Sequence, residues 1–349
     1  MVPAALGYRW PAEWEDHAAT WLVWPHNPDT WPGRLPQAQR AFAGFVRELH
    51  WREPVRLLVP DAAAEADARR QLAGAGCDLR DRIELHRVPT NDAWLRDSGP
   101  IFLVRDAAGR RERALADFDF DSWGGKYPPW DRDDAVPGEL ERLLGLPRFE
   151  AGFVLEGGSV DGNGAGCVLT TESCLLNPNR EAGRTREGME RRLADWLGAR
   201  RVLWLAGGIE GDDTDGHVDD VARFVDAGTA VAVVRDDPAD PDHAPLAENL
   251  RRLRAMRDAE GKPLSVATLP MPPPLSVGGL RCPASYANVV FANGCVLVPT
   301  FGAAEDERAL AVLRELLPGR DVVGVPSADL VQGLGALHCL SQQEPAAAG

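Results

Sequence analysis

The chain has 349 residues, of which 44% are hydrophobic, and a formal net charge of −15. A chain of this size buries enough apolar surface for one large domain or two ordinary ones, so we expect a globular protein. The negative field repels phosphate groups. This disfavours nucleic acids and anionic membranes as partners, and it suits a small cationic ligand.

The sequence shows no pattern typical of export or membrane insertion. Its N-terminal stretch lacks a basic segment followed by an apolar core, and no apolar run reaches the roughly 18 residues of a membrane helix. The six cysteines form neither a CxxC pair nor a Cys and His metal spacing. We therefore predict a cytoplasmic protein with free thiols, most of them buried core residues. Cys339 differs because it follows His338 in a Gly-rich, polar segment, which favours a reactive thiol.

A hairpin, an amphipathic helix and a single strand recur along the chain in that order. The hairpin turns fall near residues 108, 163, 227 and 293, so they lie 55, 64 and 66 residues apart. The expected hairpins are Ile101–Ala116 around residues 107–109, Phe153–Thr171, Val221–Val234 and Asn288–Pro299. The expected helices are Ala135–Leu144, Arg184–Leu197, Pro245–Ala259 and Asp306–Leu317. The strands that follow them are Arg148–Leu155, Arg201–Leu205, Leu264–Leu269 and Asp321–Val325.

The N-terminal part supplies the second half of one more unit, with a helix at Leu35–His50 and a strand at Val55–Pro60. Its hairpin requires Thr20–Trp24 to pair with the chain end near Leu337–Leu340. An extra helix at 62–75 and strand at 83–88 make this unit irregular. The pattern predicts one α/β domain over residues 1–345, a propeller of five ββαβ modules, followed by a short tail at 346–349. An open α/β sheet is the alternative.

The segment 211–224, GDDTDGHVDDVARF, places five aspartates around His217. Carboxylates packed this closely repel one another, so something cationic is expected beside them. The segment fits a solvated acidic loop, a metal site of carboxylate and imidazole ligands, or a His and Asp pair that grips an organic cation. The residues of this segment alone leave the three options open.

Other polar residues occupy equivalent places in the predicted modules. Asp97 precedes the first hairpin, Glu156 opens the second, His217 and Asp219 precede the third, and Cys339 lies in the module that closes the ring. Equivalent strand ends of a propeller face one axis, so these side chains are expected to meet there.

Each candidate also has a structural interpretation. Asp97 next to Arg96 is typical of an ion pair, Glu156 before two glycines is typical of a turn cap, and His217 alone is more often a hydrogen-bonded core histidine. His338 alternates with Cys339 in extended chain, so it is assigned to the structure rather than to catalysis.

The residues resemble the agmatine deiminase family, close to the bacterial peptidyl-arginine deiminases and within the guanidino-group modifying superfamily. Six motifs carry the resemblance in chain order, across nearly the whole sequence. They are PAEWEDHAATWLVWP within 10–25, NDAWLRDSGP at 91–100, WGGKYPPWDRDD at 123–134, LEGGSVDGNG at 155–164, GDDTDGHVDDVARF at 211–224 and LHCLSQQ at 337–343. The segment GLGALHC departs from the family's usual GGGNIHC-like sequence at Leu334 and Ala336, which concerns the pocket wall.

The resemblance implies a five-bladed α/β (pentein) propeller and a hydrolase that needs no metal or cofactor. It implies that Cys339 is the nucleophile that forms a thiouronium intermediate and that His217 is the acid and base. Asp97, Asp219 and Glu156 would then accept the N–H groups of the guanidinium. It also implies that Trp94 lies at the pocket wall.

The expected reaction is hydrolysis of agmatine to N-carbamoylputrescine and ammonia, a step toward putrescine. The acidic surroundings of the motifs favour a doubly cationic substrate, and Asp213 is our choice for the residue nearest its distal ammonium. We expect Arg96 and Arg223, the arginines nearest the motifs, to pair with acidic neighbours.

Four other functions stay open at this stage. They are deimination of arginine or peptidyl-arginine, amidino transfer to an amine, hydrolysis at a divalent metal held by the acidic segment, and binding without catalysis. The sequence also leaves the oligomeric state open, with a homodimer as one option.

Overall fold

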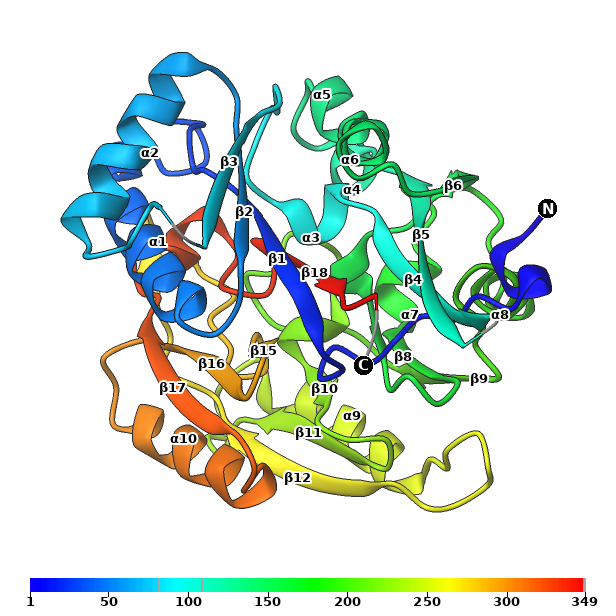
Figure 1. Cartoon of the computed structure of the whole chain (residues 1–349). Coiled ribbons are helices and arrows are strands. Elements are labelled where there is room, and N and C mark those ends of the chain that lie inside the picture. The colour runs from blue at the N-terminus through cyan, green and yellow to red at the C-terminus, as the bar shows by residue number, and fades with distance from the viewer. Residues whose placement is uncertain (81, 108, 348–349) are drawn as a thin grey trace.

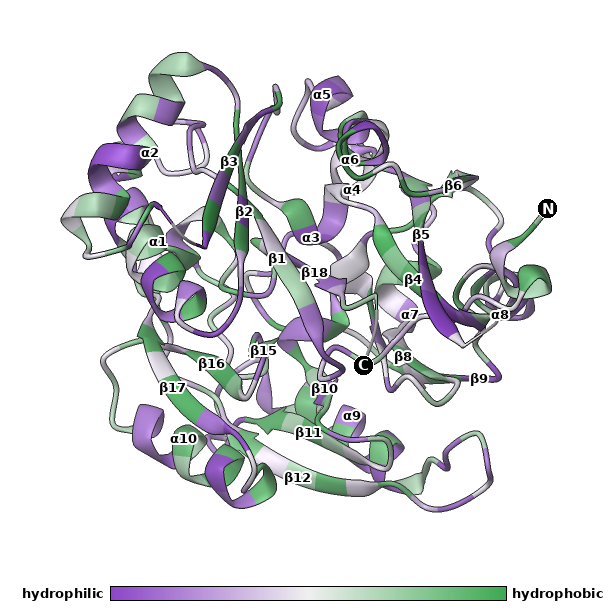
Figure 2. Cartoon of the chain, viewed as in Figure 1, coloured by the Kyte–Doolittle hydropathy of each residue, from purple (hydrophilic) through white to green (hydrophobic). Residues whose placement is uncertain are grey.

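The protein is described by a computed structural model that covers residues 1–80, 82–107 and 109–347. It is a mixed α/β fold built from several small sheets, with the longer helices toward the outside of the molecule (Figure 1). Helices such as α1 (Leu35–His50) and α10 (Glu305–Leu316) carry both hydrophobic and hydrophilic residues, as expected of helices with one face on the core (Figure 2). Within the described residues, no helix is long and apolar enough to cross a membrane.

Four sheets share one topology, in which an antiparallel pair is followed by a parallel third strand. The predicted hairpin, helix and strand units are thus confirmed as elements. The sheets are β4 (Ile101–Ala107), β5 (Arg110–Asp119) and β6 (Arg148–Val154); β7 (Val160–Gly162), β8 (Cys167–Thr171) and β9 (Arg201–Leu205); β10 (Ala222–Phe224), β11 (Thr229–Val234) and β12 (Ser265–Pro270); and β15 (Val290–Ala292), β16 (Cys295–Thr300) and β17 (Asp321–Pro326). A separate hairpin joins β13 (Ser276–Val277) to β14 (Leu280–Arg281).

The connecting helices lie within a few residues of their predicted bounds. They are α6 (Val136–Leu144), α8 (Arg186–Leu197), α9 (His243–Ala255) and α10 (Glu305–Leu316). The Thr185 hydroxyl accepts from the Gly188 N–H, so α8 starts two residues later than predicted. Helix α9 ends four residues before the predicted Ala259, because the Asp258 carboxylate accepts from the N–H groups of Glu260 and Lys262 and folds that segment into a turn.

The second hairpin also starts later than predicted. Phe153 belongs to β6 of the preceding sheet, and a short 3₁₀ turn, η2 (Gly157–Ser159), separates it from β7. The other short helices are η1 (Pro3–Leu6), α3 (Leu95–Ser98), α4 (Ser122–Gly125), α5 (Asp131–Asp134), α7 (Glu172–Leu175), η3 (Val218–Asp220) and η4 (Val331–Gly333).

The fifth sheet joins the two ends of the chain in the order β18, β1, β2, β3. Strand β1 (His17–Val23) pairs antiparallel with β18 (Ser341–Pro345), and parallel with β2 (Val55–Val59). Helices α1 (Leu35–His50) and α2 (Ala62–Gly74) and strand β3 (Ile83–Arg87) lie within two residues of their predicted ends.

The predicted pairing partner of β1, Leu337–Leu340, is wrong by a few residues. These residues form a turn, and the strand begins only at Ser341. The predicted turn residue Ala108 and the last two residues of the predicted tail, 348–349, lie outside the described residues.

The terminal sheet is fastened by one buried carboxylate. Glu344 of β18 is 1% exposed and accepts from Trp21 Nε1 at 2.8 Å. The same carboxylate forms ion pairs with Arg56 of β2 and Arg113 of β5. Glu344 therefore links the last strand to its own sheet and to the neighbouring one.

We expect the Glu344→Ala variant to lower the free energy of unfolding by about 2–3 kcal/mol, because Arg56 and Arg113 lose a shared buried partner. Urea denaturation measures this. Glu84→Ala is the matched control, since Glu84 pairs with the same Arg56 but is 54% exposed, and it should cost roughly 0–1 kcal/mol. Equal costs for the two variants would contradict this fastening role.

Candidate active site

A cavity of about 1030 Å³ contains most of the predicted site residues on its wall. Trp94, Asp97, Asp213, His217 and Cys339 line it, together with residues that the sequence did not single out. Those of chemical interest are Trp123, Lys126, Tyr127, Arg132 and Asp220. Segments from the start, the middle and the end of the chain thus meet at one cavity.

Asp97 lies in the short helix α3 and is 5% exposed. Its Oδ2 accepts from Trp123 Nε1 at 3.0 Å, and its Oδ1 accepts from the Gly158 N–H at 2.9 Å. Burial raises the pKa of Asp97 to about 6. The two bonds fix the carboxylate at the cavity wall, and any ligand cation there favours its ionised form.

His217 stands directly before η3 and is 2% exposed. Its backbone N–H donates to Asp212 Oδ2, and its ring Nδ1 is 3.8 Å from Asp97 Oδ1. Burial alone would lower the pKa of His217, but Asp97, Cys174 and Glu156 together outweigh it and raise this pKa well above the ordinary value. The ring is therefore an imidazolium at neutral pH, and it can give up a proton.

Asp219 is fully buried and lies in η3. Its Oδ2 accepts from His338 Nδ1 at 2.7 Å and is 3.8 Å from Cys339 Sγ. Burial opposes ionisation, yet the hydrogen bond from His338 lowers the pKa of Asp219. Its second oxygen, Oδ1, has no hydrogen-bond partner in the part of the chain that the structure describes.

Cys339 is 8% exposed and faces the cavity from the turn before β18. Asn288 Nδ2 donates to its Sγ at 3.1 Å and to Asp220 Oδ1 at 3.0 Å. Burial, followed by the negative charges of Asp219, Asp220 and Asp97, raises the pKa of the Cys339 thiol well above its ordinary value. The Cys339 side chain is thus a protonated thiol in the free protein.

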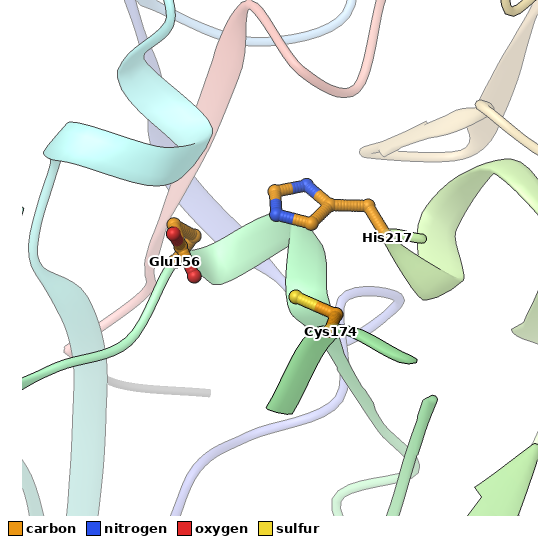
Figure 3. A group of neighbouring side chains, drawn as sticks. All are labelled: Glu156, Cys174 and His217. Carbon is orange, nitrogen blue, oxygen red and sulfur yellow. The ribbon is translucent and has the colours of Figure 1, made fainter. Parts of the chain in front are cut away.

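Glu156 is buried but is not among the residues that line the cavity. Arg180 Nε donates to its Oε1 at 2.6 Å, and the same guanidinium pairs with Asp215. Glu156, Cys174 and His217 point toward one another (Figure 3). Glu156 therefore adds negative charge close to His217, while one of its oxygens is already engaged.

The cavity also carries aromatic rings and charges of both signs. A Cβ atom on Gly335 would lie 2.4 Å from the Trp94 ring, so only glycine lets the segment before Cys339 pack against that ring. Leu334, in the segment that departs from the family pattern, adopts φ +72° and lines the cavity. The Tyr127 hydroxyl donates to Asp213 Oδ2 at 2.5 Å, which fixes Asp213 on the wall.

Two groups of side chains have the composition of a metal site. One is Glu156, Cys174 and His217, and the other is Asp219, Asp220 and Cys339, with ligand atoms within 4.8 Å of one another in each group. In the first group the Arg180 guanidinium is bonded to Glu156, and in the second His338 is bonded to Asp219. Both groups thus already have a basic side chain bonded to one of their carboxylates.

Sequence reasoning missed the roles of two neighbours of Cys339, Asn288 and His338. Asn288 lies 51 residues away in the chain, which no local pattern indicates. Asp220 belongs to the acidic segment 211–224, but its place near Cys339 was not predicted. Strand alternation predicted a structural role for His338, with its side chain on the opposite face from Cys339. Residues 337–340 form a turn instead, and the His338 ring bonds to Asp219. The sequence signal was present, because His338 precedes the reactive cysteine.

The expectation that Arg96 pairs with an acidic neighbour is wrong. Its guanidinium donates to Gln342 Oε1, to Gln343 Oε1 and to the His338 carbonyl. Arg223 does pair with carboxylates, those of Asp161 and Glu13.

Comparisons with known proteins agree with this geometry. The model of the Porphyromonas-type peptidyl-arginine deiminases matches residues 9–345. A protein named agmatine deiminase from Ectopseudomonas mendocina is 37% identical over 371 aligned positions, which cover 100% of this chain and 98% of that protein. The solved agmatine deiminase of Enterococcus faecalis is 34% identical with a TM-score of 0.91, over 99% of this chain and 97% of that one.

Two further structures add to the comparison. One is an agmatine deiminase of C. jejuni in which serine replaces a cysteine, with substrate bound. It is 29% identical with a TM-score of 0.87, over 98% of this chain and 97% of that one. A dimethylarginine dimethylaminohydrolase, 14% identical with a TM-score of 0.51, covers 94% of this chain and 99% of its own. That likeness relates the fold to the guanidino-group modifying (pentein) fold. The chain belongs to the Porphyromonas-type peptidyl-arginine deiminase family.

Proposed function

We propose that the protein is an agmatine deiminase, which hydrolyses the guanidinium of agmatine to N-carbamoylputrescine and ammonia. The observation that carries the proposal is the buried cavity wall on which a thiol, an imidazolium and carboxylates meet. The agmatine deiminases among its full-length relatives support the same choice.

The first step is capture of the guanidinium by carboxylates. Asp97 and Asp219 are buried, and Asp219 Oδ1 has no partner within the described residues, so it can accept guanidinium N–H groups. Glu156 contributes mainly through its charge, because Arg180 occupies one of its oxygens. Held in this way, the guanidinium carbon lies beside Cys339 Sγ.

The second step is attack by the thiolate. The bound cation offsets the negative charges that keep Cys339 protonated, so the thiol releases its proton to water when substrate is present. Sulfur then bonds to the guanidinium carbon. The Asn288 amide, which donates to Sγ at 3.1 Å, stabilises the sulfur anion before attack.

The third step is release of ammonia and hydrolysis. His217 gives its proton to the departing nitrogen as the C–N bond breaks, which leaves an S-alkylthiouronium on Cys339. Neutral His217 then takes a proton from water, whose oxygen bonds to the same carbon. The C–S bond breaks, and the ureido product and the thiol are formed. Side chains and water supply every group, so we propose no metal or cofactor.

We further infer that the five sheets are the blades of a closed, pseudosymmetric propeller in one domain over residues 1–345. The shared strand order of four sheets and the pairing of both chain ends in the fifth support this arrangement. A cytoplasmic location, a homodimer and the absence of nucleic-acid partners stay predictions from the sequence.

Arginine or peptidyl-arginine is the second candidate substrate. Lys126 and Arg132 line the cavity, and a cation near its mouth suits a carboxylate. Lys126 already pairs with Asp215, however, and Asp213 on the same wall suits an ammonium. This balance favours agmatine.

We expect agmatine to give a higher kcat/KM than free arginine or a peptide with C-terminal arginine. The measurement is ammonia and ureido product formed by purified protein with each substrate. Asp213→Asn should weaken the preference for agmatine, because it removes the charge opposite the distal ammonium. A higher kcat/KM for an arginine substrate would move the protein to the second candidate, and activity with none would reject deimination.

We expect Cys339→Ser to lower kcat by about 10³-fold or more while substrate still binds, since a serine hydroxyl lacks the nucleophilicity of a thiolate. Steady-state kinetics and isothermal titration with agmatine measure the two effects. Cys77→Ser is the matched control, because Cys77 is also 8% exposed and packs in the core away from the cavity. Comparable turnover by Cys339→Ser and Cys77→Ser would exclude a covalent mechanism.

The raised pKa of Cys339 predicts slow alkylation of the free protein. Thiolate forms as pH rises through this pKa, so the rate of labelling by iodoacetamide should still increase above pH 9, the ordinary range of a thiol. Peptide mass analysis identifies the labelled site, with Cys339→Ala as the blank. A rate that levels off near pH 7 would instead indicate a thiolate formed before substrate binds.

A further inference from the structure

His338 lies between two buried carboxylates. Its Nδ1 is 2.7 Å from Asp219 Oδ2, and its Nε2 is 3.0 Å from Glu13 Oε2. The imidazole is 2% exposed, Asp219 is 0% exposed and Glu13 is 6% exposed, so water does not serve these groups. The three side chains form a line that ends beside Cys339.

The number of protons in this line follows from its geometry. A neutral imidazole has one N–H donor and one lone pair, and that lone pair would face a carboxylate oxygen. An imidazolium donates from both nitrogens. The doubly protonated form of His338 is therefore the one that satisfies Glu13 and Asp219 when both are ionised.

Glu13 is held in its ionised form from its other side. Its Oε1 accepts from the Phe291 N–H at 2.9 Å, and its carboxylate pairs with the buried Arg223. Burial opposes ionisation, but the charges of Arg223 and His338 lower the pKa of Glu13 well below its usual range. Glu13 thus cannot easily take the proton that His338 holds.

We propose that Glu13 and His338 are positioning residues, which keep Asp219 ionised and turned so that its Oδ1 receives the guanidinium. This inference rests on the proposed function, and it assigns to that site two residues that do not touch the reacting atoms. Bonding from His338 fixes Oδ2, so the rotation of the carboxylate is set. The unpartnered Oδ1 is the oxygen that remains for substrate.

Among the neighbours of Asp219, His338 lowers the pKa of its carboxyl the most. His338 lies 2.7 Å from Asp219 Oδ2 and the Cys339 thiol approaches the same oxygen at 3.8 Å, whereas His217 and Arg223 act through space. The charged and titratable groups that face Asp219 or His338 are Glu13, Arg96, Asp97, His217, Asp220, Arg223 and Cys339. Several of these are anionic, so Asp219 without His338 shifts toward its protonated form.

The test compares two buried histidines. We expect His338→Gln to lower kcat/KM for agmatine roughly 10- to 100-fold. His338 lowers the pKa of Asp219, so its loss raises that pKa, and the acidic limb of the kcat/KM profile should move to higher pH. His50→Gln is the control, because His50 is also 2% exposed but bonds the Arg47 carbonyl in α1. Its acidic limb should match that of the unchanged protein.

A second measurement needs neither activity nor a variant. In protein with ¹⁵N-labelled histidine, both ring nitrogens of His338 should carry protons at pH 7. Pairwise labelling assigns the residue, because His338 and Cys339 form the one His–Cys pair in the sequence. A singly protonated His338, or an unmoved acidic limb in folded His338→Gln, would overturn the proposal. If the wild-type protein deiminates no guanidine, the proposed function is wrong, whereas the NMR result on His338 still stands.

Discussion

The chemistry of this protein depends on a buried thiol that lies among carboxylates. Asp219 Oδ2 is 3.8 Å from Cys339 Sγ, and the charges of Asp97 and Asp220 add to its field. Such surroundings disfavour a thiolate until a cation arrives. A planar guanidinium with several N–H donors offsets the charges and satisfies their oxygens at once. Under the proposed function, substrate binding and activation of Cys339 are therefore one electrostatic event, and a neutral urea product, which offsets nothing, is readily released.

The fold holds these carboxylates in place by pairing them from behind. His338 bonds Asp219, Arg180 bonds Glu156, and Arg223 is fully buried against Asp161 and Glu13. Unpaired buried charges cost several kcal/mol, so a wall of bare carboxylates would not fold. Donors on the protein side satisfy carboxylate oxygens of Asp219 and Glu156, neither of which is among the residues that line the cavity, whereas Asp97 is.

Local patterns predicted most of the elements, since hairpin turns, helix periodicity and caps depend on nearby residues. The Asn293 and Gly294 turn and the apolar spacing of α10 are examples. Contacts between distant segments could not be predicted in this way. Glu13 meets Arg223 across 210 residues, and Glu344 meets Arg56 across 288, and neither pair belongs to one periodic element. His338 shows a different limit: strand alternation assigns its side chain correctly only in a strand, and residues 337–340 turn.

The pairing of charged side chains also explains why the part of the cavity near Asp213 suits a second positive charge. Lys126 has its charge offset by Asp215, whereas Asp213 accepts its hydrogen bond from the neutral hydroxyl of Tyr127. Burial raises the pKa of Asp213, so an ammonium placed beside it would favour the ionised carboxylate. Under the proposed function, the guanidinium is held beside Asp97, and Asp213 is the carboxylate proposed to receive the distal ammonium.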